Sequence, residues 1–437
     1  MDHIISKLLI YGSIPEDSIL SRVAAICRDA REDRAPADEL VTRSYREVKR
    51  ILEISTDYGF DRNLWQNYLT FLIITDENPF ALTCEKEGAH DGSVNYFAKN
   101  DFDAFLKLFH YDFSSLERKL GTDCFSQICN YKAIVKPELM YNGNVSEKVC
   151  ALSRELDACR DKDAFFDCVT SFYRDIGVGM FGLNKAFRIS ADADGEVIFH
   201  AINNMDRVML SDLVGYESQK KKLTDNTRAF VEGRGANNCL LYGDAGIGKS
   251  TSIKAIVNEF YPMGLRMIEI YKHQFQLLSP VIAKIKNRNY KFIIYMDDLS
   301  FEEFEIEYKF LKAVIEGGVE TRPENVLIYA TSNRRHLIRE TWNDRSDMES
   351  DNGLHRSDTM EEKLSLVNRF GVTINYSKPA QKEFFHIVTE LAHRAGLQMS
   401  DEELCREANK WELRGSGMSG RSAQQLITYL KGQTQVS

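Results

Sequence analysis

The chain has 437 residues, of which 43% are hydrophobic and 28% charged, and its formal net charge is −9. That length predicts about two or three domains, each large enough to bury its own core. The composition is that of a folded protein and excludes a disordered or fibrous chain. The acidic balance disfavours a generally basic nucleic-acid-binding surface, although a local basic face stays open, so nucleic acid is a possible but unsupported partner.

The N-terminus lacks the basic start and long apolar core of a signal peptide. No stretch approaches the roughly 20 apolar residues of a membrane span. Nine cysteines are scattered without a CxxC pair, which speaks against a secreted disulfide framework and against a zinc site. We therefore expect a cytoplasmic protein without a membrane span, whose cysteines are mostly buried thiols.

Residues 1–180 show apolar side chains at helical spacing, as in Phe102, Phe105, Leu106 and Phe109. We expect a mainly helical N-terminal domain here. Its aromatic stripes indicate core packing rather than a ligand or partner groove, so no chemistry is assigned to it.

Residues 181–211 are expected to form a β-hairpin and a linker. Two strand-like runs, Lys185–Ser190 and Glu196–Ala201, flank Asp194-Gly195, a dipeptide that favours a tight hairpin turn.

Residues 212–378 alternate short β-rich runs with helical stretches. The five runs are 239–242, 265–271, 292–296, 326–330 and 372–376. Strands separated by helices predict a five-stranded parallel sheet covered on both faces, and hence an α/β core of three layers. After Lys378-Pro379 the pattern is wholly helical, which predicts a helical lid over residues 379–437.

A phosphate-binding loop pattern, GxxxxGK(S/T), follows the first β-rich run of this core and opens a helical stretch. Glycines let the backbone curl so that several N–H groups point at one anion, and the helix N-terminus adds a favourable dipole. We expect Lys249 to reach the β- and γ-phosphates of ATP and Ser250 to hold a magnesium ion. The alternative is a glycine-rich turn with an accidental lysine, which the flanking strand and helix disfavour. The predicted cofactor-binding residues are Gly243, Asp244, Ala245, Gly246, Ile247, Gly248, Lys249, Ser250 and Thr251.

Polar side chains end the next two strands of the predicted core. The run 292–296 is followed by Asp297 and Asp298, and Asn333 follows the run after it. Because ligands bind at the carboxyl ends of parallel strands, these groups should face the phosphate loop. Asp297 is the expected magnesium partner, and Asp298 is expected to orient or deprotonate the attacking water. The alternatives are that both acids merely begin a loop and that Asn333 caps the following helix in an Asx turn.

Together these pieces resemble the AAA+ superfamily of P-loop NTPases. The stretch from Leu213 to Lys431 is similar to one branch of it, the ATP-binding family known as DUF815. The matching blocks are 213–216 with Gln219, 226–227, 237–250, 297–302, 330–337, 365–366 with 369–371, and 419–423.

The resemblance assigns roles to further residues. Val214, Gly215 and Tyr216 would line the adenine pocket, and Asn333 would be the sensor-1 residue. Arg421 would be sensor 2, reaching from the lid to the γ-phosphate. Arg369 sits where the superfamily places an arginine finger that inserts into the site of the neighbouring subunit. For both arginines a surface ion pair is the alternative.

The chain departs from the superfamily pattern at several places. Most AAA+ proteins have glutamate where Asp298 stands, which leaves Glu302 or Glu303 as alternative bases, or a slow turnover. Asn368 replaces a usual aspartate. The segment 271–276 lacks the aromatic, apolar, glycine triplet of threading machines, which disfavours an unfoldase. A polar insertion over 341–361 predicts a solvated loop, with an oligomer or partner contact as the alternative.

The expected function is that of an AAA+ ATPase that binds Mg-ATP and hydrolyses it to drive or gate a conformational change. We expect a homo-oligomer in which Arg369 acts in trans, and an unknown protein client bound through the N-terminal domain. One alternative is a nucleotide-gated binding switch with little turnover. Another is a DNA-associated loader or remodeller, with Lys220–Lys222, Arg334 and Arg335 as phosphate contacts. A GTPase is disfavoured because no NKxD-like segment follows the predicted magnesium-binding strand.

Overall fold

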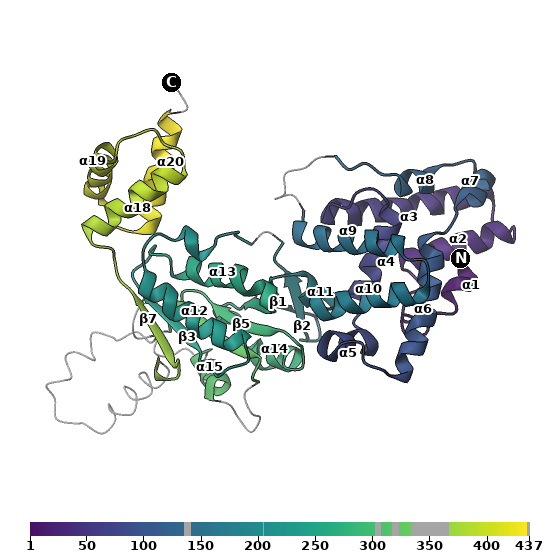
Figure 1. Cartoon of the computed structure of the whole chain (residues 1–437), viewed down its shortest axis with the longest axis horizontal. Coiled ribbons are helices and arrows are strands. Elements are labelled where there is room, and N and C mark those ends of the chain that lie inside the picture. The colour runs from purple at the N-terminus through teal and green to yellow at the C-terminus, as the bar shows by residue number, and fades with distance from the viewer. Residues whose placement is uncertain are drawn as a thin grey trace. The chain divides into compact units, whose positions relative to one another are not determined.

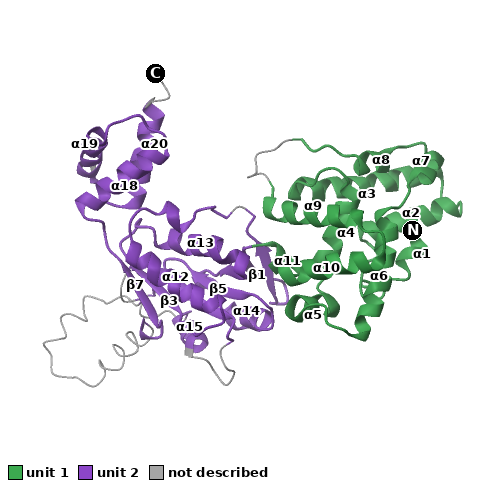
Figure 2. Cartoon of the chain, in the orientation of Figure 1, with its two compact units in different colours: residues 1–184 green, residues 185–437 purple. Residues whose placement is uncertain are grey.

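Two patterns of apolar residues, helical at first and then alternating between strand and helix, produce two units in the computed structural model (Figure 2). The N-terminal unit comprises residues 1–184 and the C-terminal unit residues 185–437. The structure describes residues 1–134, 141–203, 205–301, 307–316, 323–333, 337 and 367–434. Glu302, Glu303, Arg334, Arg335 and the insertion 341–361 lie outside these ranges.

The N-terminal unit is helical, as Figure 1 shows. Its core is rich in aromatic side chains: Trp65, Phe102, Phe105 and Phe165 are all fully buried. The aromatic stripe of the sequence lies on α6, where it packs inward rather than lining a groove. The helices are α1 (Asp2–Ile5), α2 (Ile19–Arg31), α3 (Ala37–Tyr58), α4 (Leu64–Thr75), α5 (Pro79–Glu87), α6 (Ser93–Phe109), α7 (Ser114–Leu120), α8 (Cys124–Cys129), α9 (Gly143–Ala158), α10 (Lys162–Asp175) and α11 (Gly179–Leu183).

One buried acid holds the segment between α1 and α2. The carboxylate of Asp101, on α6, accepts hydrogen bonds from the backbone N–H groups of Leu9 (3.0 Å), Ile10 (2.7 Å) and Tyr11 (2.9 Å). Asp101 is 1% exposed, so these amides replace the water that a buried carboxylate loses. The N-terminal segment is thereby fixed to α6.

The C-terminal unit is built on a seven-stranded sheet in the order β2-β1-β4-β5-β6-β3-β7. All neighbouring pairs for which a register is given are parallel except β1 with β2. The strands are β1 (Ala186–Ala191), β2 (Val197–Ala201), β3 (Cys239–Gly243), β4 (Leu265–Glu269), β5 (Lys291–Met296), β6 (Val326–Ser332) and β7 (Val372–Tyr376).

The prediction of five strands was wrong. The five predicted parallel strands are present, but the hairpin that we expected within a linker extends the sheet at its β4 edge. Strand β1 pairs in parallel with β4, with Ala186 opposite Met267 and Arg188 opposite Glu269. The physical reason is that β4 would otherwise end the sheet with unpaired backbone groups, and β1 satisfies them.

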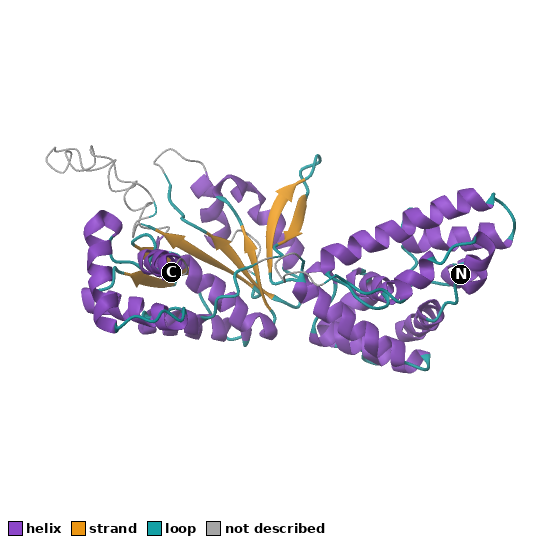
Figure 3. Cartoon of the chain, turned by 90° about the horizontal axis from the view of Figure 1, so that it is seen from above, coloured by secondary structure: helices purple, strands orange, loops and turns teal. Residues whose placement is uncertain are grey.

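Helices lie on both faces of the sheet (Figure 3). Helices α12 (Glu217–Val231) and α13 (Lys249–Phe260) pack against alternate strand residues such as Leu241, Ile293 and Tyr329. Helices α14 (Leu278–Ile285) and α15 (Glu307–Glu316) contribute no residue to that cluster and contact each other instead. The result is a three-layer α/β core.

After β7 the chain forms three lid helices, α18 (Gln381–Arg394), α19 (Asp401–Trp411) and α20 (Gly420–Thr434). They enclose a small core of their own around Phe384, Leu404 and Leu426. Helix α19 begins at a capping box, in which Ser400 and Glu403 satisfy each other's backbone N–H groups. Across the described ranges, no helix is long and apolar enough to cross a bilayer.

Candidate functional site

The loop between β3 and α13 adopts a backbone that glycine favours. Gly243, Gly246 and Gly248 have φ values of +136°, +75° and +94°. At Gly243 the constraint is also steric, because a Cβ atom there would lie 1.7 Å from the carbonyl oxygen of Tyr376 on β7. These glycines let the loop curl over the first turn of α13, where free N–H groups and the helix dipole favour an anion.

Lys249 opens α13 and is 6% exposed. Its ammonium donates hydrogen bonds to the carbonyl oxygens of Gly243 (2.9 Å) and Asp244 (2.6 Å) and to Oδ1 of Asn333 (3.0 Å). Burial lowers the pKa of this ammonium, although the negative charges of Asp298, Asp244 and Asp297 oppose the effect. A partly desolvated cation therefore lies inside the loop.

The Asp297 carboxylate accepts hydrogen bonds from two hydroxyl groups. Ser250 Oγ donates to Asp297 Oδ1 at 2.7 Å, and Thr331 Oγ1 donates to the same oxygen at 2.6 Å. Burial raises the pKa of this carboxyl, but the hydrogen bonds from Thr331 and Ser250 outweigh it and hold the pKa below its ordinary value. The carboxylate is therefore ionised at neutral pH.

Asp298 has a strained backbone, with φ +48°. Its N–H donates to Thr331 Oγ1 at 2.9 Å, and its Oδ1 accepts a hydrogen bond of 2.7 Å from Nδ2 of Asn333. Asn333 thus connects Asp298 to Lys249. The side chain that we expected to be sensor 1, with a helix cap as the alternative, thus bonds to both Asp298 and Lys249.

Sequence reasoning gave Thr331 no role, although it contacts both acids. The signal was present in the parallel pairing of β5 and β6, which sets Met296 opposite Ala330. The residues that follow, Asp297 and Thr331, must then be neighbours at the carboxyl edge.

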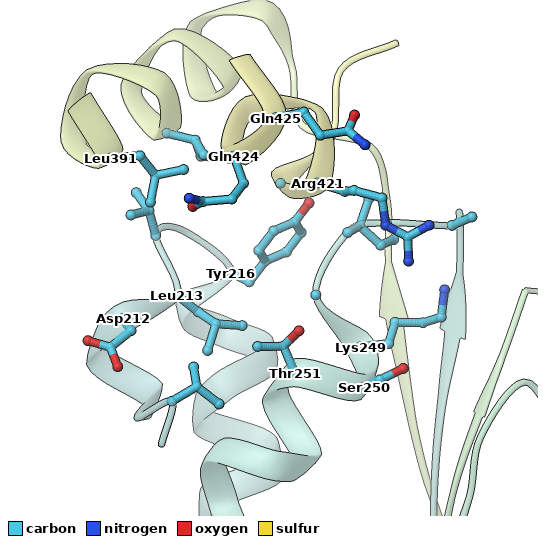
Figure 4. Close-up of a pocket in the computed structure, with 18 of the residues that line it drawn as sticks. Asp212, Leu213, Tyr216, Lys249, Ser250, Thr251, Leu391, Arg421, Gln424 and Gln425 are labelled. Atoms are coloured by element: carbon cyan, nitrogen blue, oxygen red, sulfur yellow. The ribbon is translucent and has the colours of Figure 1, made fainter. Parts of the chain in front are cut away.

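A cavity of about 1290 Å³ lies between the α/β core and the lid. Figure 4 shows its walls, with Lys249, Ser250 and Thr251 below and α20 above. Its lining includes Ala245–Thr251, Asp297, Asp298, Thr331 and Asn333. Gly215, Gly243 and Asp244 do not line the cavity, and the last two act through their carbonyl contacts with Lys249.

Apolar side chains line the other end of the cavity. Val214 and Tyr216 come from the segment before α12, and Ile387 and Leu391 from α18 of the lid. The Tyr216 ring packs against Tyr376 with 5.2 Å between ring centroids, and its hydroxyl donates to the Ser377 carbonyl at 3.2 Å. The two lid residues were not predicted, because their helical spacing indicates only packing within the lid.

Arg421 links the lid to the loop. Its backbone N–H donates to the carbonyl oxygen of Gly246 at 3.0 Å, and its side chain extends toward the Lys249 side of the cavity (Figure 4). The positive charge of Arg421 is among the influences that lower the pKa of Lys249. Both cations therefore face the same space.

Arg369 precedes β7 and does not line the cavity. Of the basic cluster Lys220–Lys222, Lys220 already bonds to the Leu213 carbonyl (2.8 Å) and to Glu217 (2.6 Å). The structure does not bring either of these sites together with Lys249.

The donor set fits a magnesium ion held mainly by phosphate and water. Ser250 and Asp297 offer one hydroxyl and one carboxylate side by side. Within the described part of the chain, no cluster of three or more His, Cys, Asp or Glu side chains could hold a metal by itself. Mg²⁺ commonly keeps several waters and takes only one or two protein oxygens beside a nucleotide.

The glycine loop opening α13, the paired acids after β5, the amide after β6 and the helical lid define a P-loop nucleotide-binding module of the AAA+ class. Residues 183–434 match the family described as Protein of unknown function (DUF815), and the chain belongs to that family.

Comparison with curated proteins gave no match. Solved structures that align with the chain include the Thermotoga maritima RuvB Holliday junction branch migration motor, at 16% identity and a TM-score of 0.36, covering 52% of this chain and 65% of that chain. A mutant of Thermotoga maritima RuvB aligns at 14% identity and a TM-score of 0.36, covering 52% and 66% of the two chains. The chain thus spans just under two thirds of these RuvB chains.

Proposed function

We propose that the chain is an AAA+ ATPase that binds Mg-ATP between core and lid and hydrolyses it. The observation that supports this most is the connected set Lys249, Asn333 and Asp298, with Ser250 and Asp297 beside it. A cation for phosphate, a metal-ligand pair and a carboxylate base are the parts that phosphoryl transfer to water requires.

The loop and Lys249 would bind the phosphates. The Lys249 ammonium now bonds to two carbonyl oxygens and one amide oxygen, all of them neutral acceptors. Phosphate oxygens are stronger, charged acceptors, so they would take over bonds of this ammonium. The apolar end of the cavity, with Val214, Tyr216, Ile387 and Leu391, suits the adenine ring.

Ser250 and Asp297 would hold Mg²⁺, which neutralises charge on the phosphate oxygens. Asp298 would act as the general base toward water. Asn333 holds its carboxylate in a fixed direction and can also contact the γ-phosphate. Arg421 would add positive charge from the lid and would make lid closure depend on the third phosphate.

We further propose a cytoplasmic homo-oligomer in which Arg369 enters the site of a neighbouring subunit, and a protein client bound by the N-terminal unit. The position of Arg369 away from the cavity of its own chain is compatible with action in trans. A finger supplied by another subunit stabilises transition-state charge and makes hydrolysis depend on assembly.

The test is steady-state ATP hydrolysis against protein concentration, with Asp298→Asn as the control for chemistry and Lys249→Ala for binding. We expect specific activity to rise with concentration in the native chain. Asp298→Asn should bind ATP and lose about 10²- to 10⁴-fold in turnover, the range for a positioned base. Lys249→Ala should fail to bind. Native-like turnover in Asp298→Asn would remove the base assignment.

One observation favours a second candidate, a nucleotide-gated switch with little turnover. The Asp298 side chain is one methylene shorter than glutamate, and in this structure its carboxylate is already bonded to Asn333. Tight ATP binding without turnover at any protein concentration would establish the switch in place of the ATPase.

A further inference from the structure

Tyr295 lies near the end of β5, two residues before Asp297, and is 1% exposed. Its ring packs in the core that the sheet forms with α12 and α13. Its hydroxyl is buried and forms no hydrogen bond of normal geometry within the described ranges. A buried hydroxyl without a partner costs the full desolvation of that group, so this position calls for an explanation.

The surroundings of the hydroxyl are the predicted metal ligands. Burial raises the pKa of Tyr295 above its ordinary value, and the negative charge of Asp297 raises it further. Ser250 and Thr331 are the other groups near enough to affect the ionisation of this hydroxyl. A tyrosine hydroxyl is an O–H donor at neutral pH in any case, so this one is available to the Asp297 carboxylate two residues further along the chain.

Two other tyrosines on the same side of the sheet have partners. Tyr329, on β6 directly opposite Tyr295, bonds through its hydroxyl to Thr227 (2.8 Å) and Asn226 (3.0 Å). Tyr376, on β7, donates to Ser252 at 3.0 Å. The hydroxyl without a partner is thus the one next to the proposed magnesium site.

The hydrogen bonds that Asp297 now accepts indicate a role for the Tyr295 hydroxyl as an additional donor. Oδ1 of Asp297 accepts from Ser250 and from Thr331. A serine that ligates a metal turns an oxygen lone pair toward the ion, which changes the direction of its own O–H group. The carboxylate then needs another donor to keep its orientation, as metal ligands commonly do.

We propose that Tyr295 is a positioning residue for magnesium, whose hydroxyl donates to the Asp297 carboxylate when Ser250 engages the ion. This inference rests on the proposed binding of Mg-nucleotide at Ser250 and Asp297. It adds a residue from inside the sheet that sets the direction of a metal ligand.

The test compares Tyr295→Phe with Tyr329→Phe, which removes a hydroxyl of equal burial from the opposite residue of the next strand. The measurement is equilibrium binding of a fluorescent ADP analogue, first with chelator and then over a range of Mg²⁺ concentrations. Thermal unfolding of both variants without nucleotide is recorded alongside.

For Tyr295→Phe we expect unchanged binding in chelator and a rise of about tenfold in the Mg²⁺ concentration that half-maximally tightens binding, the lower end for a group behind a metal ligand. Its unfolding temperature should not fall, because the lost hydroxyl has no partner. Tyr329→Phe should lower the unfolding temperature and leave the Mg²⁺ dependence unchanged.

A native Mg²⁺ dependence in Tyr295→Phe overturns the inference while the proposed function stands. The same holds if both variants shift the Mg²⁺ dependence equally, because the effect then comes from the fold of the sheet. If the native chain itself binds the ADP analogue without any influence of Mg²⁺, the proposed function fails and this inference fails with it.

Discussion

Nδ2 of Asn333 donates a hydrogen bond of 2.7 Å to Oδ1 of Asp298. The other atom of the same amide, Oδ1, accepts from Lys249 at 3.0 Å. One side chain therefore holds the proposed base on one side and the proposed phosphate-binding cation on the other. Removal of the Asn333 side chain should therefore lower the rate of hydrolysis without a matching loss of nucleotide affinity.

Asn333→Ala frees the Asp298 carboxylate and leaves the loop and Lys249 in place. We expect about a 100-fold loss of turnover with nucleotide affinity changed by less than about threefold, because a carboxylate without its donor samples unproductive directions. Single-turnover hydrolysis and equilibrium binding check the two numbers separately. An equal loss in both would mean that Asn333 serves binding, and an unchanged unfolding temperature shows that the fold is intact.

Arg421→Ala removes the guanidinium but keeps the backbone hydrogen bond from residue 421 to Gly246. The lid should therefore stay attached to the loop while the charge for the third phosphate is lost. We expect ADP affinity close to native, ATP affinity reduced by about tenfold and a slower turnover. Competition between ATP and ADP at equilibrium measures the difference. Equal weakening of both nucleotides would contradict a role at the γ-phosphate.

Arg369→Ala should bind ATP normally and hydrolyse it slowly even at high protein concentration, with a loss of about 10³-fold as for other fingers. Action in trans gives a sharper test by mixing Arg369→Ala with Lys249→Ala, two variants that are each inactive. A mixed interface then pairs a competent site from one chain with an intact Arg369 from the other. Recovered activity supports the role in trans, and mixtures as inactive as their components remove it.

Asp101→Ala leaves the amides of Leu9, Ile10 and Tyr11 without their acceptor. Because the carboxylate and the Tyr11 amide are buried and the amides of Leu9 and Ile10 bond to it in partly buried positions, we expect a loss of about 2 kcal/mol in the free energy of unfolding of the N-terminal unit. The matched control is Asp103→Ala on the same helix, whose exposed ion pair with Lys107 is worth less than about 1 kcal/mol. Urea unfolding by circular dichroism measures both. Nucleotide binding should not change in either variant.

Much of the site could be predicted because local patterns fix it. The loop glycines and Lys249 follow from one motif, and Asp297, Asp298 and Asn333 follow from the ends of two apolar strands. Thr331 could not be assigned a role in that way, because a hydroxyl after a strand acquires its neighbours only when the register with β5 is known. The role proposed for Tyr295 could not be predicted for a similar reason, because an aromatic residue in an apolar strand has the same sequence pattern as any core residue.

The fold shows the same division between local and long-range information. Each of the five predicted parallel strands could be recognised as an apolar run, because a strand that is covered on both faces needs apolar side chains on both. The hairpin was also visible from its turn, but a hairpin's sequence does not say which sheet edge it joins. Its pairing with β4 depends on contacts between distant segments, such as Ala186 with Met267.

The lid chain leaves the core at Tyr376, which faces Gly243 across β3 and β7. A second attachment joins residue 421 to Gly246 a few residues along the same loop. Two attachment points define a line, so a lid that keeps both contacts would rotate about that line rather than slide. The displacement would be smallest beside the proposed phosphate site and would grow with distance from it. Rotation of this kind would open and close the proposed adenine end of the cavity while the contacts of the loop with the proposed phosphate site stay unchanged.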